Sequence, residues 1–312
     1  MLELALMIEG QNGLTWESWQ RIATAAEGLG FTGLYRSDHF TNANPPDLAS
    51  LELWSSLTWL ASHTRRIEFG PLVTPFSFRH PALTARSAAA VDDLSGGRLI
   101  LGLGAGWQER EHANFGFSLL SLKDRFDRFE EGLQVVTLLL RSDRPVDFAG
   151  KYYQLREAIL LPRPVRPGGP PILVGGSGRN RTLSFAARFA SHWNAGMLPP
   201  DRFAELNRLL DELLRAGERQ PAEVRRSMMV GCIFGKTDER VRRQVEERTR
   251  GQRSAGELRE RGMIVGTPGE VVEQLGRLAE AGAQRVMLQW LDLEDIDGLE
   301  AIARDVIPQL GN

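Results

Sequence analysis

The alternation of two hydrophobic periods constrains the fold of this chain more than any other feature. Short apolar runs of strand length alternate with longer stretches in which apolar residues recur at helical spacing, and the first such pair covers residues 2–8 and 16–29. The pattern predicts eight strands, each followed by a helix, at residues 2–8, 33–36, 66–74, 98–105, 171–175, 193–195, 227–234 and 285–290. Such alternation gives a parallel sheet, and eight repeats close into a barrel more readily than they form an open sheet. The sequence therefore predicts an α/β protein with a (β/α)8 TIM barrel.

Three longer segments interrupt the alternation and are interpreted as insertions on the carboxyl-terminal face of the barrel. They lie near residues 107–122, 143–170 and 248–266, and the middle one contains a predicted β-hairpin that turns near Gly150. The length of 312 residues fits two domains of about 150 residues or one barrel of about 250 residues with insertions. No linker or repeat divides the chain, so one domain over residues 1–312 is expected.

The composition excludes several classes of protein. The formal net charge is −2, so no overall basic field would attract nucleic acid or a membrane surface. The longest nearly uncharged run, residues 99–108, falls short of the 18 or so residues that a membrane helix needs. The single cysteine, Cys232, excludes an internal disulfide and a Cys-rich metal site. No export signal follows Met1, so a cytoplasmic protein is expected.

Arginine is in strong excess, because only Lys123, Lys151 and Lys236 among the 38 basic residues are lysines. Two interpretations stay open. One is a coding bias without functional meaning, and the other is recognition of carboxylates or phosphates, which the arginine fork binds well.

Four motifs stand where predicted strands end, which is where barrel active sites form. They are Arg36-Ser-Asp-His-Phe40, Gly70-Pro-Leu-Val-Thr-Pro75 with Arg79-His-Pro81, Gly102-Leu-Gly-Ala-Gly-Trp107, and Val174-Gly-Gly-Ser-Gly178 with Arg179-Asn-Arg181. His39 can titrate near neutral pH, and the last motif can direct free backbone N–H groups at a phosphate. A Rossmann dinucleotide site is excluded, because Trp107 stands where its fingerprint requires a third glycine.

Together these motifs resemble those of the luciferase-like monooxygenase superfamily, especially its branch of oxidoreductases that use the deazaflavin coenzyme F420. The resemblance is carried in order by Ser37-Asp-His-Phe40, Arg79-His-Pro81, the run from Leu94 to Trp107, and Pro171-Ile-Leu-Val-Gly-Gly-Ser-Gly178, and it extends over residues 4–307. It implies a (β/α)8 barrel, usually a homodimer, that transfers a hydride between the coenzyme and a small organic substrate. In such enzymes the coenzyme carries the redox chemistry, and the protein supplies orientation and proton handling.

The resemblance also implies a role for each motif. His39 would exchange a proton with the substrate, and Asp38 would orient the site. The peptide between Leu72 and Val73 would be cis, with its bulge behind the coenzyme ring. The ring pocket would be lined by Leu72, Val73, Thr74, Gly104, Ala105, Gly106 and Trp107. The phosphate would be held by Gly175, Gly176, Ser177, Gly178 and Arg179, with Arg79 and Arg181 as further candidates for the anionic tail.

Two departures from the family pattern narrow the prediction. Sugar-phosphate-oxidising members carry an acidic residue where this chain has Trp107, which argues against glucose 6-phosphate as substrate. The flavin-using branch more often has Glu-His-His where this chain has Ser37-Asp-His, which favours F420 over FMN. Three alternatives stay open: an FMN-dependent monooxygenase supplied by a separate reductase, a non-catalytic flavin-binding barrel, and a phosphate-binding barrel isomerase or aldolase.

Overall fold

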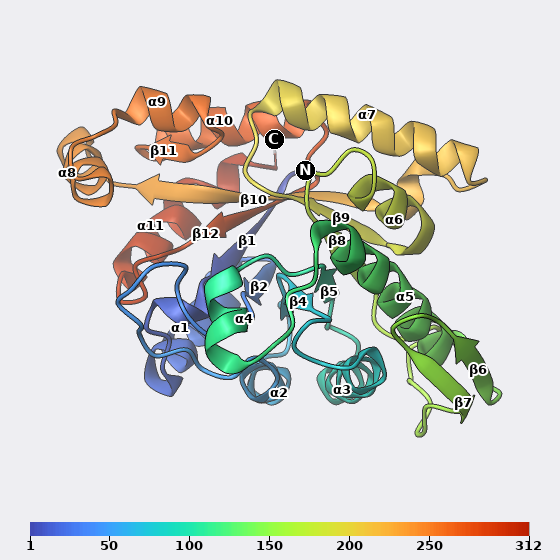
Figure 1. Cartoon of the computed structure of the whole chain (residues 1–312). Helices are drawn as coiled ribbons and strands as arrows, with labels where there is room; N and C mark the ends of the chain where they lie inside the picture. Colours follow the sequence, from blue (N-terminus) through green and yellow to red (C-terminus); the bar gives the residue numbers. More distant parts are fainter. Residues whose placement is uncertain (312) are drawn as a thin grey trace.

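Parallel strands form a nearly closed barrel in the computed structural model, which describes residues 1–311 (Figure 1). Hydrogen bonds join the strands in the order β3-β2-β1-β12-β10-β9-β8-β5-β4. The bounds are β1 (Glu3–Ile8), β2 (Gly33–Arg36), β3 (Glu68–Pro71), β4 (Thr74–Pro75), β5 (Leu101–Gly104), β8 (Ile172–Gly175), β9 (His192–Ala195), β10 (Arg225–Phe234) and β12 (Arg285–Gln289). β3 and β4 are two pieces of one barrel strand, interrupted at Leu72 and Val73. The nine pieces therefore correspond to the eight predicted strands, and the TIM-barrel prediction is confirmed.

The barrel closes where the interrupted strand, β3 with β4, approaches β5. β3 pairs with β2, β4 pairs with β5, and an isolated bridge joins Phe69 to Leu99. Glycine is required at this seam: a Cβ on Gly70 would lie 1.9 Å from a carbonyl oxygen of the facing backbone, and one on Gly102 would lie 2.0 Å from another. Between the two pieces, the peptide from Leu72 to Val73 is cis, as the family resemblance implies.

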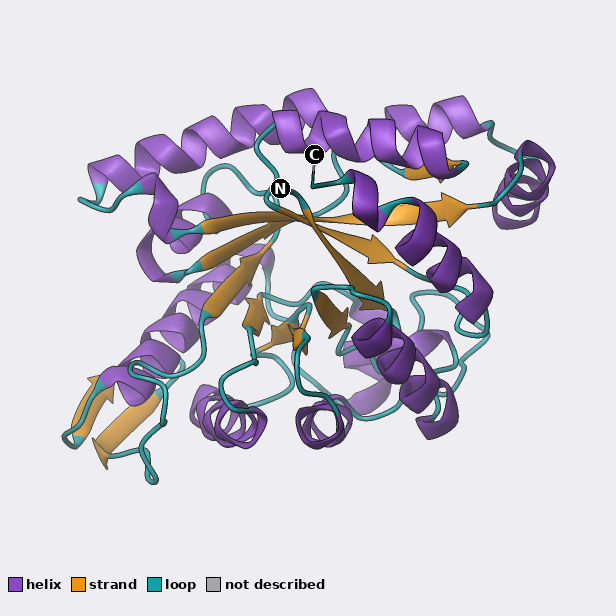
Figure 2. Ribbon diagram, turned by 180° about the vertical axis from the view of Figure 1, so that it is seen from behind, coloured by secondary structure: helices purple, strands orange, loops and turns teal. Residues whose placement is uncertain are grey.

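Helices cover the outside of the barrel on all sides, as the view from behind shows (Figure 2). They are α1 (Trp16–Gly28), α2 (Leu53–His63), α3 (Pro81–Ser95), α5 (Leu122–Arg141), α6 (Thr182–Phe189), α7 (Pro200–Ala216), α8 (Asp238–Thr249), α10 (Pro268–Glu280) and α11 (Ile296–Asp305). At the start of α10, the Glu270 carboxylate accepts a hydrogen bond from the backbone N–H of Thr267 at 2.9 Å, as in a capping box. In α5, Phe129, Leu133 and Val136 recur at helical spacing and are buried against the barrel.

Alternate residues of the strands fill two different layers of core. One set points into the barrel, and it comprises Ala5, Met7, Tyr35, Leu72, Ile100, Leu173 and Met287. The other set points outward and packs under the helices. At the amino-terminal end, the nearly inaccessible Arg285 closes the interior by binding Glu3 (2.5 Å), Glu68 (2.6 Å) and the Tyr35 hydroxyl (2.6 Å). At the carboxyl-terminal end, the interior opens into a cavity lined by Met7, Leu72 and Val73.

The inserted segments contain more regular structure than their sequences predict. Residues 107–122 include α4 (Glu109–Phe115), and residues 248–266 include α9 (Ala255–Glu260) and β11 (Ile264–Gly266), which pairs with the end of β10. The predicted hairpin is confirmed as β6 (Val146–Ala149) and β7 (Gln154–Ala158). It differs from the expectation in following a helix, α5, rather than a strand, and Figure 1 shows it beside α5 at the edge of the molecule.

The tip of this hairpin folds back along α5. The backbone N–H groups of Lys151 and Tyr152 donate to Glu131 at 2.8 Å, and the Tyr152 hydroxyl donates to Asp124 in the first turn of the helix. The middle insertion therefore reaches back toward the end of the barrel at which α5 begins. Among residues 1–311, no helix has the length and apolar character that crossing a membrane requires.

The seam glycines give a test of the barrel closure. Gly102→Ala should lower the free energy of unfolding by about 3 kcal/mol, because its Cβ meets backbone rather than a movable side chain. Gly276→Ala in α10 is the matched control: its Cβ meets nothing within 4 Å, and alanine should stabilise that helix by about 0.5–1 kcal/mol. Denaturant unfolding of both variants checks the pair. Equal effects would contradict the close approach at the seam.

Candidate active site

A cavity of about 240 Å³ lies at the carboxyl-terminal end of the barrel, where the first three motifs converge. Its floor is apolar and is made by Met7, Leu72, Val73 and Met229. Its walls carry Glu9, Ser37, Asp38, His39, Pro75, Phe78, Gly106, Trp107 and Glu111. Of the residues predicted to surround the ring, four line this cavity: Leu72, Val73, Gly106 and Trp107. The other three, Thr74, Gly104 and Ala105, do not line the cavity.

His39 enters the cavity from the end of β2 and is held by a buried carboxylate. Its Nδ1 lies 2.9 Å and 3.2 Å from the two carboxylate oxygens of Glu111 in α4, and Trp107 meets the ring edge-on at 5.5 Å. Burial lowers the pKa of His39, but the hydrogen bond and charge of Glu111 outweigh burial, so the pKa is raised above its ordinary value. Because Nδ1 is occupied, Nε2 is the ring nitrogen left for a ligand.

Asp38 is turned away from His39 and has other partners. Its carboxylate accepts a hydrogen bond from the Thr74 hydroxyl at 2.6 Å and forms an ion pair with Arg79. The same guanidinium also binds Glu52 at 2.9 Å. Burial raises the pKa of Asp38 despite the opposing charge of Arg79. Thr74 and Arg79 therefore hold Asp38, and Arg79 lies in this ion pair rather than free for an anionic tail.

Gly104 and Gly175, both predicted to contact the cofactor, leave space for the Val73 side chain of the floor. A Cβ on Gly104 would lie 2.4 Å from the Val73 side chain, and a Cβ on Gly175 would lie 2.8 Å from it. Ala105 is half-buried and packs against the outer core. These three residues position Val73 and the loop toward Gly106, and contact with a ligand is not needed to explain them.

The glycine-rich loop after β8 forms a separate cradle beside the floor. Gly176 has φ +123°, which side-chain-bearing residues rarely adopt, and the Ser177 hydroxyl accepts from the Gly196 amide at 3.1 Å. Since α6 begins at Thr182, Ser177 is not its N-cap. Within residues 1–311, the backbone amides of residues 177–181 donate no hydrogen bond. This run of free N–H groups suits an anion.

The two arginines of this motif differ in their surroundings. Arg179 is close to half exposed and pairs with Glu205, whereas Arg181 binds Asp127 at 2.5 Å and lies over the rings of Phe126 and Phe185. Arg179 remains at the loop, and Arg181 fastens the loop to α5.

A family model described as luciferase-like monooxygenase matches residues 7–285. This chain belongs to the luciferase-like monooxygenase family. An F420-dependent glucose-6-phosphate dehydrogenase of Intrasporangium calvum is 27% identical over 313 residues, which cover 91% of this chain and 92% of that protein. The pyrimidine monooxygenase RutA of Agrobacterium fabrum is 32% identical over 56% of this chain. F420-dependent dehydrogenases and monooxygenases are thus both homologues of this luciferase-like enzyme.

The solved structures agree on the fold. An F420-dependent secondary alcohol dehydrogenase in complex with an F420-acetone adduct superimposes with a TM-score of 0.87 at 20% identity, over 100% of this chain and 99% of that one. The matches to RutA and to several F420-dependent dehydrogenases span about half the length of those relatives.

Sequence reasoning missed Glu111, the strongest partner of His39 in this luciferase-like site. Residues 107–122 read as irregular, because a seven-residue helix shows too few turns for its period to stand out. His112 anchors this helix: its Nδ1 lies 2.6 Å from the Gln108 carbonyl and its Nε2 lies 2.8 Å from the Ser77 hydroxyl. Within residues 1–311, no cluster of His, Cys, Asp and Glu could hold a metal ion.

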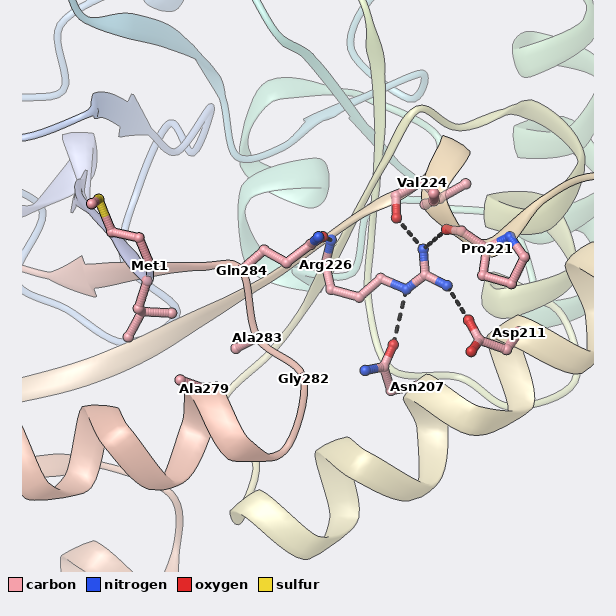
Figure 3. Close-up of a pocket in the computed structure, with 12 residues that line it drawn as sticks. Met1, Asn207, Asp211, Pro221, Val224, Arg226, Ala279, Gly282, Ala283 and Gln284 are labelled. Atoms are coloured by element: carbon pink, nitrogen blue, oxygen red, sulfur yellow. Dashed lines mark hydrogen bonds and ion pairs between the residues drawn. The ribbon is translucent and has the colours of Figure 1, made fainter. Parts of the chain in front are cut away.

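A larger cavity of about 550 Å³ lies at the opposite, amino-terminal end of the luciferase-like barrel (Figure 3). Arg226 dominates it, and each of its nitrogens already has a partner: Asn207 at 2.9 Å, the Pro221 carbonyl at 2.7 Å, the Val224 carbonyl, and Asp211. The guanidinium thus holds α7 against the start of β10. Four of its five N–H donors are engaged within the protein. The smaller cavity at the other end, where the family motifs converge, is the candidate site.

The Asp38–Arg79 pair predicts a pH-dependent loss of stability. Arg79→Ala leaves a buried carboxylate without its cation and should cost about 3–5 kcal/mol, whereas Arg188→Ala removes an exposed pair with Glu130 and should cost less than about 1 kcal/mol. Losing Arg79 raises the pKa of Asp38 further. The loss of folding free energy is therefore greatest above that pKa, where Asp38 is charged, and it becomes smaller as acid protonates Asp38. Unfolding at about pH 8 and about pH 5 checks this. A loss that is the same at both pH values would contradict it.

Proposed function

We propose that this chain is an F420-dependent oxidoreductase that transfers a hydride between the deazaflavin and a small organic substrate. The observation that carries the proposal is His39, whose Nδ1 is bound by Glu111 and whose ring lies above an apolar floor. The near-full-length relative that uses F420 supports the choice of coenzyme. Membership of the luciferase-like family, with F420-dependent dehydrogenases and monooxygenases as relatives, supports a redox enzyme over a non-catalytic barrel, an isomerase or an aldolase.

The residues present fit such a coenzyme. The apolar floor of Leu72 and Val73 suits one face of a flat ring, with Gly106 and Trp107 at its edge. The free amides of residues 177–181 suit a phosphate, and Gly175, just before this loop, lies against Val73 of the floor. When bound, F420 would supply a carbon that accepts or gives a hydride.

The protein would supply proton handling and orientation. Nε2 of His39 would accept a proton from a substrate hydroxyl during oxidation and return it in the reverse direction. Asp38, tied to Arg79 and Thr74, would fix the end of β2 beside the floor. Arg179 would add a cation near the phosphate.

An FMN-dependent monooxygenase, supplied with reduced flavin by a separate reductase, is the second candidate. The homology with RutA favours it, because that relative is a monooxygenase and matches over more than half of this chain. FMN shares the flat ring and the phosphate, so the same floor and cradle would serve.

We also propose a single-domain protein that acts as a homodimer in the cytoplasm. Large apolar side chains that stay exposed on one chain support an association. Among them are Leu83, Leu94 and Val165. Sedimentation at several protein concentrations tests the dimer.

Titration with both coenzymes tests the choice between them. F420 should bind more tightly than FMN, followed by absorbance and fluorescence, and tighter binding of FMN would overturn the proposal. Gly176→Ala, which forces a side chain into φ +123°, should weaken F420 at least tenfold. The phosphate-free deazaflavin chromophore is the control: its affinity should be the same for wild type and variant, because it does not use the cradle.

The charge of the cavity predicts the kind of substrate. None of the residues that line it is Lys or Arg, while Glu9, Asp38 and Glu111 are acidic, and Glu9 binds the neutral amides of Gln11 and Gln289. With F420 present, an uncharged secondary alcohol should therefore be oxidised, and glucose 6-phosphate should not. Reduction of the coenzyme by 2-propanol, cyclohexanol and glucose 6-phosphate, followed by absorbance, checks this. Faster turnover of the sugar phosphate would contradict the charge argument.

A further inference from the structure

Glu111 is a buried carboxylate with no Lys or Arg beside it. Its side chain is 2% exposed, and within residues 1–311 its hydrogen-bond donors are His39 and the backbone N–H of Phe40 at 3.0 Å. A carboxylate removed from water requires a cation or several donors to offset the lost hydration. His39 is the one partner that can become a cation.

We propose that Glu111 is the positioning residue for His39: it keeps the proton on Nδ1, directs Nε2 into the cavity and stabilises the imidazolium that forms when Nε2 takes a proton. This inference rests on the proposed function, in which His39 carries the proton. It adds a residue on a different element, and it assigns the tautomer that His39 must have.

The neighbours of the imidazole leave it one orientation. Trp107 stands at 82° to the ring, which blocks rotation on one side. Gln108 is near Nδ1, at 3.4 Å, but its amide nitrogen donates to the Thr41 carbonyl at 2.9 Å. The strong acceptor for Nδ1–H is therefore Glu111, as in the His–carboxylate pairs of hydrolases, where the carboxylate fixes tautomer and orientation.

The placement of Glu111 is itself determined by packing. His112, the next residue, fastens α4 to the loop after β4 through Ser77, and the same ring binds the Gln108 carbonyl. Because both ends of this ring are occupied, α4 cannot shift without breaking a buried hydrogen bond. The distance from Glu111 to His39 is thus set by the helix and not by a mobile side chain.

The charges that face His39 come from three elements. Glu111 lies on α4, Glu9 follows β1, and Asp38 precedes His39 at the end of β2, where Arg79 and Arg36 offset its charge. The uncompensated negative charges are those of Glu111 and Glu9, and both favour the imidazolium. Removing the charge of Glu111 should therefore lower the pH at which His39 loses its proton.

Glu111→Gln separates this role from a purely structural one. Glutamine keeps an oxygen for the Phe40 amide and nearly the same volume, but it carries no charge. Glu109→Gln is the matched control, because Glu109 lies on the same helix, is exposed and has no partner within residues 1–311. His39→Gln identifies the His39 resonance.

The experiment is histidine NMR on the full chain without coenzyme. The pKa of His39 should lie above about 6.5 in wild type and in Glu109→Gln, and should fall by about 1 unit or more in Glu111→Gln. An unchanged pKa in Glu111→Gln would overturn the inference. If that variant does not fold, the ¹⁵N shifts of wild type still decide: neutral His39 must carry its proton on Nδ1, and a proton on Nε2 overturns the inference.

The result is distinguishable from failure of the proposed function. If the His39 pKa falls in Glu111→Gln but the protein binds neither F420 nor FMN, the His39–Glu111 pair is supported and the proposed coenzyme is overturned. F420 binding with an unmoved pKa overturns the pair and leaves the coenzyme. With an alcohol that is oxidised, the pH at which turnover rises should shift downward in Glu111→Gln by the same amount as the NMR pKa.

Discussion

The close approach between the backbone of the interrupted strand, β3 with β4, and the backbone of β5 is the constraint on which the rest of the site depends. Gly70 and Gly102 let β3 and the strand leading into β5 lie closer than any side chain would permit. The Leu72 amide then donates to the Arg36 carbonyl at 2.7 Å, so the chain between β3 and β4 is fixed to the end of β2. Val73 is left to fill the space that Gly104 and Gly175 leave open, and the floor of the cavity follows from these contacts.

Two acidic residues near this floor have opposite surroundings and therefore different roles. Asp38 is paired with the permanent cation of Arg79, which keeps it charged and fixed. Glu111 is paired with His39, whose charge changes near neutral pH. A carboxylate beside a permanent cation contributes orientation, whereas a carboxylate beside a titratable base sets when that base holds its proton. The environment of each group, and not its chemical type, decides which of the two carboxylates bears on proton transfer.

The sequence was sufficient for features that depend on neighbours along the chain. The barrel strands and the hairpin near Gly150 follow from local sequence patterns, and both are present. The motifs at strand ends were brought together because a barrel places all carboxyl ends on one face. The convergence of His39 and Trp107 could thus be predicted from the sequence alone.

What the sequence could not show depends on partners far along the chain. Glu111 is 72 residues from His39, and nothing in its own neighbourhood marks it as buried. The pairing of Arg79 with Asp38 could not be predicted either, because the two residues lie 41 positions apart along the chain. The short α4, α9 and β11 are formed by burial against the barrel, and their few residues leave no period to detect.

The arginine excess has a structural use that neither sequence interpretation included. Several arginines bind the last backbone carbonyls of helices, which lack partners within the helix. Arg66 binds the Glu27 carbonyl at the end of α1, Arg98 binds the Ala61 carbonyl near the end of α2, and Arg163 binds the Leu140 carbonyl near the end of α5.

These helix ends lie at the amino-terminal end of the barrel, because each helix runs antiparallel to the strands. The planar guanidinium presents several donors at once and a charge that complements the helix dipole, which a lysine matches less well. Arg285 closes the interior at the same end by binding Glu3 and Glu68. One end of the barrel is thus fastened by permanent cations. The opposite end carries both the permanent cation of Arg79, paired with Asp38, and the titratable His39 beside the cavity. Proton transfer is thus proposed at the end where one ion pair, rather than a series of helix-end arginines, fixes the backbone.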